Sequence, residues 1–237
     1  MGSIYLIRHG QASFGAEDYD NLSELGSKQS HMLGQHFSNI GLNFDKVYTG
    51  AMRRHQQTAD ACLQAMALKD GKLQSAETTT LNDFNEYDHE QVFQVFRPEF
   101  KDKTKLTKFL ASQANPQKAF HTLFTQAVDR WASGQFDNEY TETWSEFKAR
   151  CKRGLDTTSK NADPSQQIAV FTSGGPISSN IQQHLNIPDT HIQTINWSMV
   201  NCSITHFLYN SKGVSLSYYN NYSHLESSIN SPFITYR

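Results

Sequence analysis

Two turns in this sequence place side chains suited to chemistry directly after short apolar segments. The first turn is residues 8–10, Arg-His-Gly, which follows the apolar run at residues 4–7. The second contains Arg54 and follows the short apolar pair at residues 47–48. An imidazole is a nucleophile or base near neutral pH, and two fixed guanidinium groups match a phosphate dianion in charge and geometry. These residue types predict a phosphate site with His9 as its reactive side chain.

Parallel strands are the elements that must position these turns. Residues 4–7, 47–48 and 168–171 have the apolar composition of strands buried on both faces. A helical pattern follows each of them; Ser23 is the expected N-cap of the first, and Pro176 lies in the first turn of the last. This alternation predicts an α/β fold, a three-layer sandwich around a mostly parallel central sheet. Ligands bind such sheets at the carboxyl ends of their strands, where both turns lie.

The remaining segments predict a hairpin and a helical cap. Residues 202–208 and 214–218 alternate in polarity and are joined by a turn, as in an antiparallel pair. Residues 88–160 contain three or four helical patterns and no convincing strand, and Thr143 with Glu146 fits a capping box. We interpret residues 1–237 as a single domain with a helical cap insertion at about 88–160, whose aromatic side chains mostly pack its core.

Composition argues against several classes of protein. Charged residues make up 19% of the 237 residues, the net charge is −2, and no basic cluster suggests a nucleic-acid partner. No apolar run approaches the roughly 20 residues that span a bilayer, and the first residues do not have the pattern of a signal peptide. Three widely spaced cysteines are typical of reduced core residues. We therefore expect a cytoplasmic protein without membrane or nucleic-acid partners.

The order of these motifs resembles the histidine phosphatase superfamily, which includes the phosphoglycerate mutase-like enzymes. Residues 6–11 match its opening strand and Arg-His-Gly-Glu/Gln signature, and residues 22–29 approximate its Leu-Thr-x-x-Gly-x-x-Gln element. Residues 54–59 match its Arg-Ala-x-Gln-Thr-Ala motif with His55 in place of alanine, and this alignment selects Arg54 over Arg53. The resemblance implies a phosphoglycerate mutase-like fold and a metal-independent phosphatase. Such an enzyme hydrolyses phosphate monoesters through a phosphohistidine on His9.

The resemblance also implies a carboxylic acid after the third strand of the family fold, and two residues qualify. Asp83 follows Leu81 in the register of the family pattern. Glu86 lies in Phe-Asn-Glu-Tyr-Asp-His, residues 84–89, which is similar to the pattern of one poorly characterised branch. We favour Glu86 as the general acid and keep Asp83 as the alternative.

Ser173 stands where the resemblance implies a second histidine. A seryl hydroxyl donates one hydrogen bond to a phosphate oxygen but brings no positive charge, and the amides of the following helix partly compensate. The resemblance thus makes His9 and Glu86 catalytic, and Arg8, Arg54 and Ser173 the phosphate ligands. It implies a small phosphate ester or another phosphorylated substrate, and neither a metal nor an organic cofactor. On this basis Ser173→His is expected to leave activity equal or higher.

Two other classes of function remain open. Because of Ser173, the protein is alternatively a phosphate-binding or regulatory relative with little or no turnover. A serine hydrolase would use Ser173 with Asp189 and His224, but Phe171 occupies the first glycine position of the nucleophile elbow. A mutase is less favoured than a hydrolase, because it must exclude water. Substrate specificity is expected to come from the cap, and the sequence leaves the substrate and the oligomeric state open.

Overall fold

A mixed sheet forms the centre of the molecule, and the computed structural model describes residues 1–13, 20–70, 77–226 and 231–236. Its strands lie in the order β3-β2-β4-β1-β5-β6. The first four strands along the chain pair in parallel, whereas β5 and β6 run antiparallel at one edge. The strands are β1 Gly2–Arg8, β2 Lys46–Thr49, β3 Thr78–Thr80, β4 Gln167–Thr172, β5 Ile204–Asn210 and β6 Gly213–Asn221.

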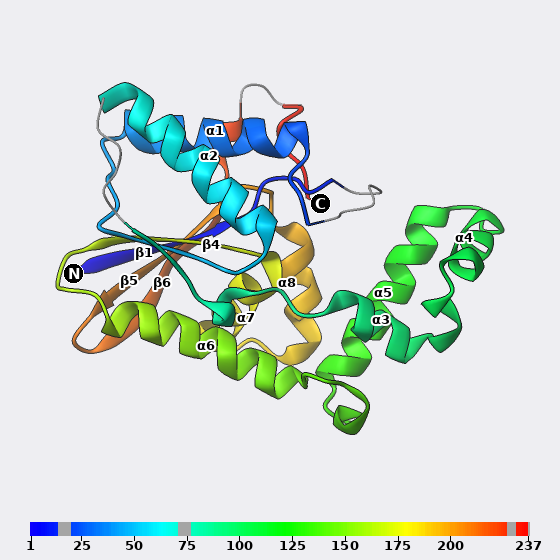
Figure 1. The fold of residues 1–237 in the computed structure, drawn as a ribbon. Helices are drawn as coiled ribbons and strands as arrows, with labels where there is room; N and C mark the ends of the chain where they lie inside the picture. The colour runs from blue at the N-terminus through cyan, green and yellow to red at the C-terminus, as the bar shows by residue number, and fades with distance from the viewer. Residues whose placement is uncertain (14–19, 71–76, 227–230, 237) are drawn as a thin grey trace.

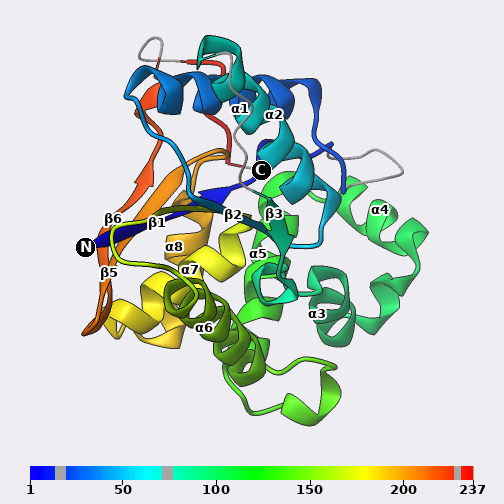
Figure 2. The same ribbon diagram turned by 60° about the vertical axis from the view of Figure 1, so that its left-hand side comes forward.

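Helices cover both faces of this sheet, so the predicted three-layer α/β sandwich with a mostly parallel sheet is confirmed. Figure 1 shows α1 and α2 on one face, α6, α7 and α8 on the other, and α3 to α5 beyond the end of the sheet. The turned view in Figure 2 shows the same layers. The helices are α1 Glu24–Asn39, α2 Arg53–Asp70, α3 His89–Phe96, α4 Lys103–Ala111, α5 Pro116–Ala132, α6 Trp144–Lys160, α7 Gly174–Leu185 and α8 Ile192–Ser198.

The apolar runs in the sequence are strands that bury both of their faces. In β1, Ile7 packs in the cluster formed with α1 and α2, whereas Ile4 and Leu6 pack in the cluster formed with α6 and α7. In β4, Phe171 and Val170 divide between the same two clusters. Burying one such side chain contributes about 1.5–3 kcal/mol relative to leaving it exposed. Both layers therefore hold β1 and β4 side by side, with their carboxyl ends at the same edge.

Most of the predicted helix starts are confirmed. The Ser23 side chain caps α1 by accepting a hydrogen bond from Gly26 N. Thr143 and Glu146 form the expected capping box at the start of α6. Pro176 lies in the first turn of α7. These helix starts could be predicted from the sequence because each signal depends on only a few neighbouring residues.

The C-terminal hairpin is also confirmed, but two elements were missed. β5 and β6 pair antiparallel across the predicted turn. β3, Thr78–Thr80, is an exposed polar strand at the edge of the sheet, so it carries no apolar alternation. α8, Ile192–Ser198, is too short for its apolar residues to establish a helical period.

Between β3 and β4 the described chain forms helices α3 to α6 and short 3₁₀ turns, which agrees with the helical patterns expected there. Their aromatic side chains share a separate buried cluster that includes Phe93, Trp131 and Trp144. The three cysteines are free and buried. Among the described residues, no helix has both the length and the apolar character needed to span a bilayer.

The partly buried His224 contributes to a dependence of the stability of this fold on pH. The ring of His224 lies 5.5 Å from the ring of His36 on α1, measured between ring centroids. Burial, and then the neighbouring His36, lower the pKa of His224 from 6.5 to about 3. Below pH 6.5 the unfolded chain therefore binds a proton that the folded chain excludes. The free energy of unfolding is expected to fall as the pH drops from about 6.5 toward about 3. This site contributes up to about 1.4 kcal/mol per pH unit.

Urea unfolding followed by circular dichroism at several values between about pH 7 and pH 5 measures this slope. His224→Phe keeps an aromatic ring at this position and removes the titrating group, so its stability should fall less steeply with acid. His191→Phe, at an exposed histidine, is the matched control and should keep the wild-type slope. Equal slopes in wild type and His224→Phe would contradict the assignment.

Candidate active site

His9 lies at the carboxyl end of β1, and its backbone is held from both sides. Its N–H donates to the carbonyl of Thr172 at 2.9 Å, and its carbonyl accepts from Asn201 Nδ2 at 3.1 Å. The residue is 5% exposed, and the ring Nδ1 lies 2.7 Å from the carbonyl oxygen of Gly10. A carbonyl only accepts, so Nδ1 carries the proton and Nε2 carries the lone pair. The fold therefore selects the tautomer whose Nε2 is a nucleophile.

The surroundings of His9 keep its ring neutral. Burial lowers the pKa of His9 well below 6.5, and the charges of Arg54 and Arg8 and the nearby His55 lower it further. The hydrogen bond to Gly10 opposes this change but does not reverse it. A neutral imidazole retains the lone pair that an attack on an electrophile needs.

Two close backbone approaches hold the turn that carries His9. A Cβ built on Gly10 would lie 2.5 Å from the carbonyl oxygen of Gly26, and one built on Gly26 would lie 2.1 Å from the carbonyl oxygen of Gln11. Gly10 N also donates to Thr58 Oγ1 at 3.1 Å, which ties the turn to α2. Side chains larger than hydrogen would separate these segments. The two glycines of the sequence motifs are thus required by the packing of this turn against α1.

The structure brings both predicted arginines to His9. Arg54, in the first turn of α2, is 4% exposed and forms an ion pair with Asp20 at 2.6 Å, whereas the neighbouring Arg53 is exposed. Arg8 donates to the carbonyls of Met199 and Tyr236. Because both guanidinium charges act on the pKa of His9, the two arginines and the imidazole share one electrostatic environment.

Glu86 and Asp83 lie in different surroundings. One carboxylate oxygen of Glu86 accepts from Gly175 N at 3.1 Å, and the other accepts from Tyr87 N at 3.2 Å. This places the carboxylate at the N-terminus of α7, directly beyond Ser173. Asp83 instead forms an ion pair with Arg153 of α6 at 2.6 Å. Of the two acids that the sequence offers, Glu86 is the one next to the helix N-terminus that follows β4.

Arg150 holds the segment that carries Glu86, a role that no sequence motif indicated. Its guanidinium donates to the backbone carbonyls of Asp83, Asn85 and Glu86, at 3.2, 2.7 and 3.4 Å. The side chain of Glu142 accepts from the same guanidinium at 2.6 and 3.0 Å. An arginine on an amphipathic helix carries no local signal that its partners are distant carbonyls.

Ser173 is buried and pairs with His55, the histidine that replaces alanine in the second arginine motif. Ser173 Oγ lies 2.6 Å from His55 Nε2, and both residues are 0% exposed. The serine hydrolase arrangement that the sequence left open is not assembled. The Asp189 carboxylate accepts from Trp144 and Lys148, and His224 lies beside His36 rather than near Ser173.

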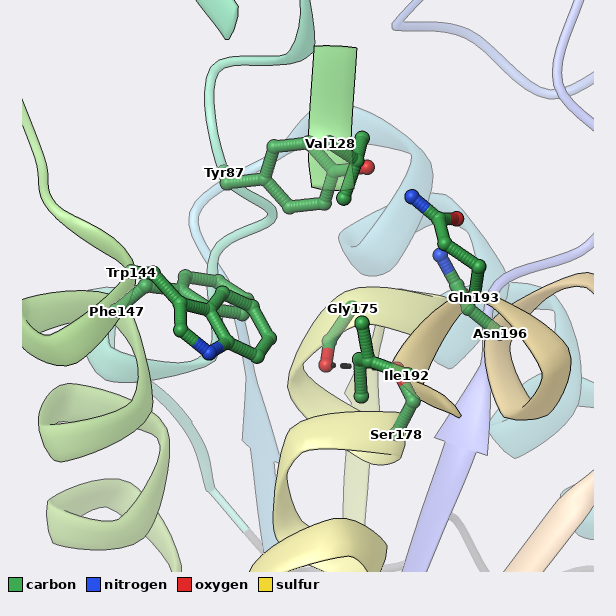
Figure 3. A pocket seen from close by; sticks show the side chains of 9 residues that line it. All are labelled: Tyr87, Val128, Trp144, Phe147, Gly175, Ser178, Ile192, Gln193 and Asn196. Atoms are coloured by element: carbon green, nitrogen blue, oxygen red, sulfur yellow. Dashed lines mark hydrogen bonds between the residues drawn. The ribbon is translucent and has the colours of Figure 1, made fainter. Parts of the chain in front are cut away.

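A small cavity lies beside this end of α7, between helices α5, α6, α7 and α8. Figure 3 shows Tyr87 and Val128 on one side of it, Gly175 of α7 opposite, and Trp144 and Phe147 of α6 flanking it. Its volume is about 10 Å³, which holds about one water molecule and no phosphate ester. We therefore regard this cavity as a gap in the packing behind Glu86.

A family model matches most of this sequence, including the residues of the site. The model of the histidine phosphatase superfamily (branch 1) matches residues 4–119 and 109–222, which include His9, Arg54, Glu86 and Ser173. The chain belongs to the histidine phosphatase superfamily. The predicted family is therefore confirmed, and its Arg-His-Gly turn and second arginine are the features that the structure brings together.

Histidine phosphatase relatives of this chain include both mutases and phosphatases. It is 35% identical over 88 residues to a 2,3-bisphosphoglycerate-dependent phosphoglycerate mutase of Bartonella bacilliformis; the match covers 34% of this chain and 41% of the mutase. It is 41% identical over 63 residues to the mitochondrial serine/threonine-protein phosphatase Pgam5 of Drosophila ananassae, over 26% of this chain and 22% of the phosphatase. The matched segments thus span less than half of either relative.

Comparison with solved structures confirms the phosphoglycerate mutase-like fold. The phosphoglycerate mutase of Bacillus anthracis str. Sterne superposes with a TM-score of 0.66 at 17% identity, covering 94% of each chain. A phosphoserine phosphatase mutant of Entamoeba histolytica, in complex with phosphoserine, gives 0.61 at 17% identity over 95% of this chain and 100% of the other. The fold is therefore shared along nearly the whole chain.

Proposed function

We propose that this protein is a metal-independent phosphatase that hydrolyses phosphate monoesters through a phosphohistidine on His9. The observation that carries the proposal is the contact between His9 Nδ1 and the Gly10 carbonyl at 2.7 Å, beside two buried or partly buried arginines. It leaves a neutral ring whose Nε2 lone pair is available to a phosphorus atom. The phosphatases and mutases among the relatives support the same reaction class.

In the first step, His9 Nε2 attacks phosphorus in line with the ester oxygen. A P–N bond forms, the P–O bond to the leaving group breaks, and Glu86 transfers its proton to the leaving oxygen. Arg8, Arg54 and the hydroxyl of Ser173 hold the equatorial oxygens. The amides at the start of α7 add partial positive charge to the same side.

In the second step, water replaces His9 on phosphorus. The Glu86 carboxylate accepts a proton from the water, whose oxygen attacks phosphorus as the P–N bond breaks. Inorganic phosphate leaves, and both His9 and Glu86 return to their starting protonation states. This sequence uses one carboxyl group as acid and then as base, so no metal-bound water is needed.

The test is to incubate the protein with a panel of ³²P-labelled phosphate esters in the presence of EDTA and to quench in alkali. Phosphohistidine survives alkali and is lost in acid, so the expected result is alkali-stable label on His9 together with release of inorganic phosphate. Absence of both label and released phosphate across the panel would overturn the proposal. Binding of inorganic phosphate without either signal would favour the phosphate-binding alternative.

A further inference from the structure

The hydroxyl of Ser173 is not used in the way that its position on the helix suggests. Ser173 is the N-cap residue of α7, where a serine normally accepts a hydrogen bond from an amide of the first turn. Here its side chain makes no such cap hydrogen bond. The hydroxyl instead meets His55 Nε2 at 2.6 Å, although the two residues are 118 positions apart. Ser173 Oγ thus does not cap the first turn of α7, and Gly175 N of that turn donates to Glu86 instead.

The direction of the His55–Ser173 hydrogen bond follows from the other nitrogen of the ring. His55 Nδ1 is buried and has no hydrogen-bond partner among the described residues. It lies against Gly50, where a built Cβ would be 2.3 Å from it. A proton on Nδ1 would leave a buried donor without an acceptor, which costs more than leaving a lone pair unused. The neutral ring therefore carries its proton on Nε2, and Nε2–H donates to Ser173 Oγ.

Burial and the Arg54 charge keep the His55 ring in this neutral form, because both lower the pKa of His55 well below 6.5. A ring that donates to Ser173 Oγ does not accept the seryl proton. That proton must point to another acceptor. The ring centroids of His9 and His55 are 5.7 Å apart, and a Cβ built on Gly174 would lie 3.7 Å from Arg8 Nε. The His55 ring that contacts Ser173 Oγ thus lies next to His9, and Gly174, the residue after Ser173, lies next to Arg8.

We propose that His55 is a positioning residue: it donates to Ser173 Oγ and so directs the seryl proton to an oxygen of the transferring phosphoryl group. This inference rests on the proposed phosphatase function. It makes His55 the partner through which Ser173 acts as a dedicated donor. The arrangement differs from that of a nucleophilic serine. There the histidine must accept the seryl proton and donate Nδ1–H to an acceptor. His55 Nδ1 faces Gly50 instead.

Four variants test the proposal on any ester of the panel that wild type turns over. Ser173→Ala and His55→Phe should each lower kcat by about 10²-fold with a smaller change in KM, because a donor to the transition state is lost. The double variant should be no slower than Ser173→Ala, since the two side chains act as one unit. His55→Gln should recover most of the activity, because its Nε2–H lies the same number of bonds from Cα and still donates. Thermal unfolding of each variant checks that the fold is retained.

Calorimetry with inorganic phosphate provides a second readout that does not require turnover. Affinity should decrease in Ser173→Ala and His55→Phe and stay near wild type in His55→Gln. If the affinities for phosphate follow this order but wild type forms no phosphohistidine, the proposed function is refuted and the role of His55 in positioning Ser173 is retained. Independent, multiplying effects of the two single variants would overturn the inference, as would a His55→Gln protein as defective as His55→Phe. Fluorophosphonate labelling of Ser173 would also overturn it.

The same contact changes the result expected for Ser173→His. Because Ser173 is 0% exposed and already touches the His55 ring, a second imidazole there would overlap His55. The single variant should therefore lose activity rather than keep or gain it. The exchanged double variant His55→Ala with Ser173→His removes the overlap and should be more active than Ser173→His alone. Full activity in Ser173→His alone would contradict the tight pairing of the two residues.

Discussion

The His9→Ala protein is expected to form no phosphohistidine and to lose phosphate release by on the order of 10⁴- to 10⁶-fold. A backbone carbonyl fixes the proton of the His9 ring on one nitrogen, while burial and arginine charge keep the ring neutral. Alanine removes the lone pair that would form the P–N bond. The nearby His55 ring does not replace it, because the free lone pair of that ring lies on Nδ1, against Gly50. Alkali-quenched labelling and phosphate release measure the two losses separately.

A binding measurement distinguishes loss of the nucleophile from loss of the site. Arg8 and Arg54 remain in His9→Ala, so inorganic phosphate should still bind in calorimetry. Added imidazole should restore part of the phosphate release by entering the space of the missing ring. His191→Ala, at an exposed histidine, is the control and should match wild type. Retention of more than a trace of wild-type turnover in His9→Ala would assign the nucleophile elsewhere.

The sandwich and the two turns that carry His9 and Arg54 could be predicted because each signal was local. The apolar runs of β1 and β4, the Ser23 cap and the glycine of the His9 turn follow from a few adjacent residues. The likeness of the motifs to a known family then selected Arg54 over Arg53. β3 was missed because an exposed edge strand needs no apolar alternation.

The contacts that sequence could not predict all join distant segments. The His55–Ser173 pair connects α2 to α7, and Arg150 reaches from α6 to three carbonyls near Glu86. The sequence shows that positions 55 and 173 both depart from the family pattern. That the two residues act together follows only from the 2.6 Å contact between them. The two departures are therefore one feature of the site. A polar side chain whose partner is far along the chain has no periodicity to reveal it.

Glu86→Gln is expected to lower kcat by about 10²- to 10⁴-fold for alkyl phosphates, because the amide can neither protonate the leaving oxygen nor take a proton from water. For an aryl phosphate such as p-nitrophenyl phosphate, the first step needs little protonation of its leaving group. The second step then becomes limiting. The variant should therefore show a burst of p-nitrophenol and accumulate labelled His9 with the aryl substrate but not with the alkyl one.

Two further variants decide whether the carboxylate at the N-terminus of α7 is the acid. Asp83→Asn removes the other candidate, which is paired with Arg153, and should leave kcat near wild type. Gly175→Ala leaves Glu86 intact, but its Cβ would lie 1.9 Å from Glu86 Oε1 and must displace the carboxylate. It should therefore reproduce the alkyl-phosphate defect of Glu86→Gln. The two carboxylates have different partners and do not substitute for one another. A defect in Asp83→Asn together with normal kinetics in Glu86→Gln would therefore identify Asp83 as the general acid.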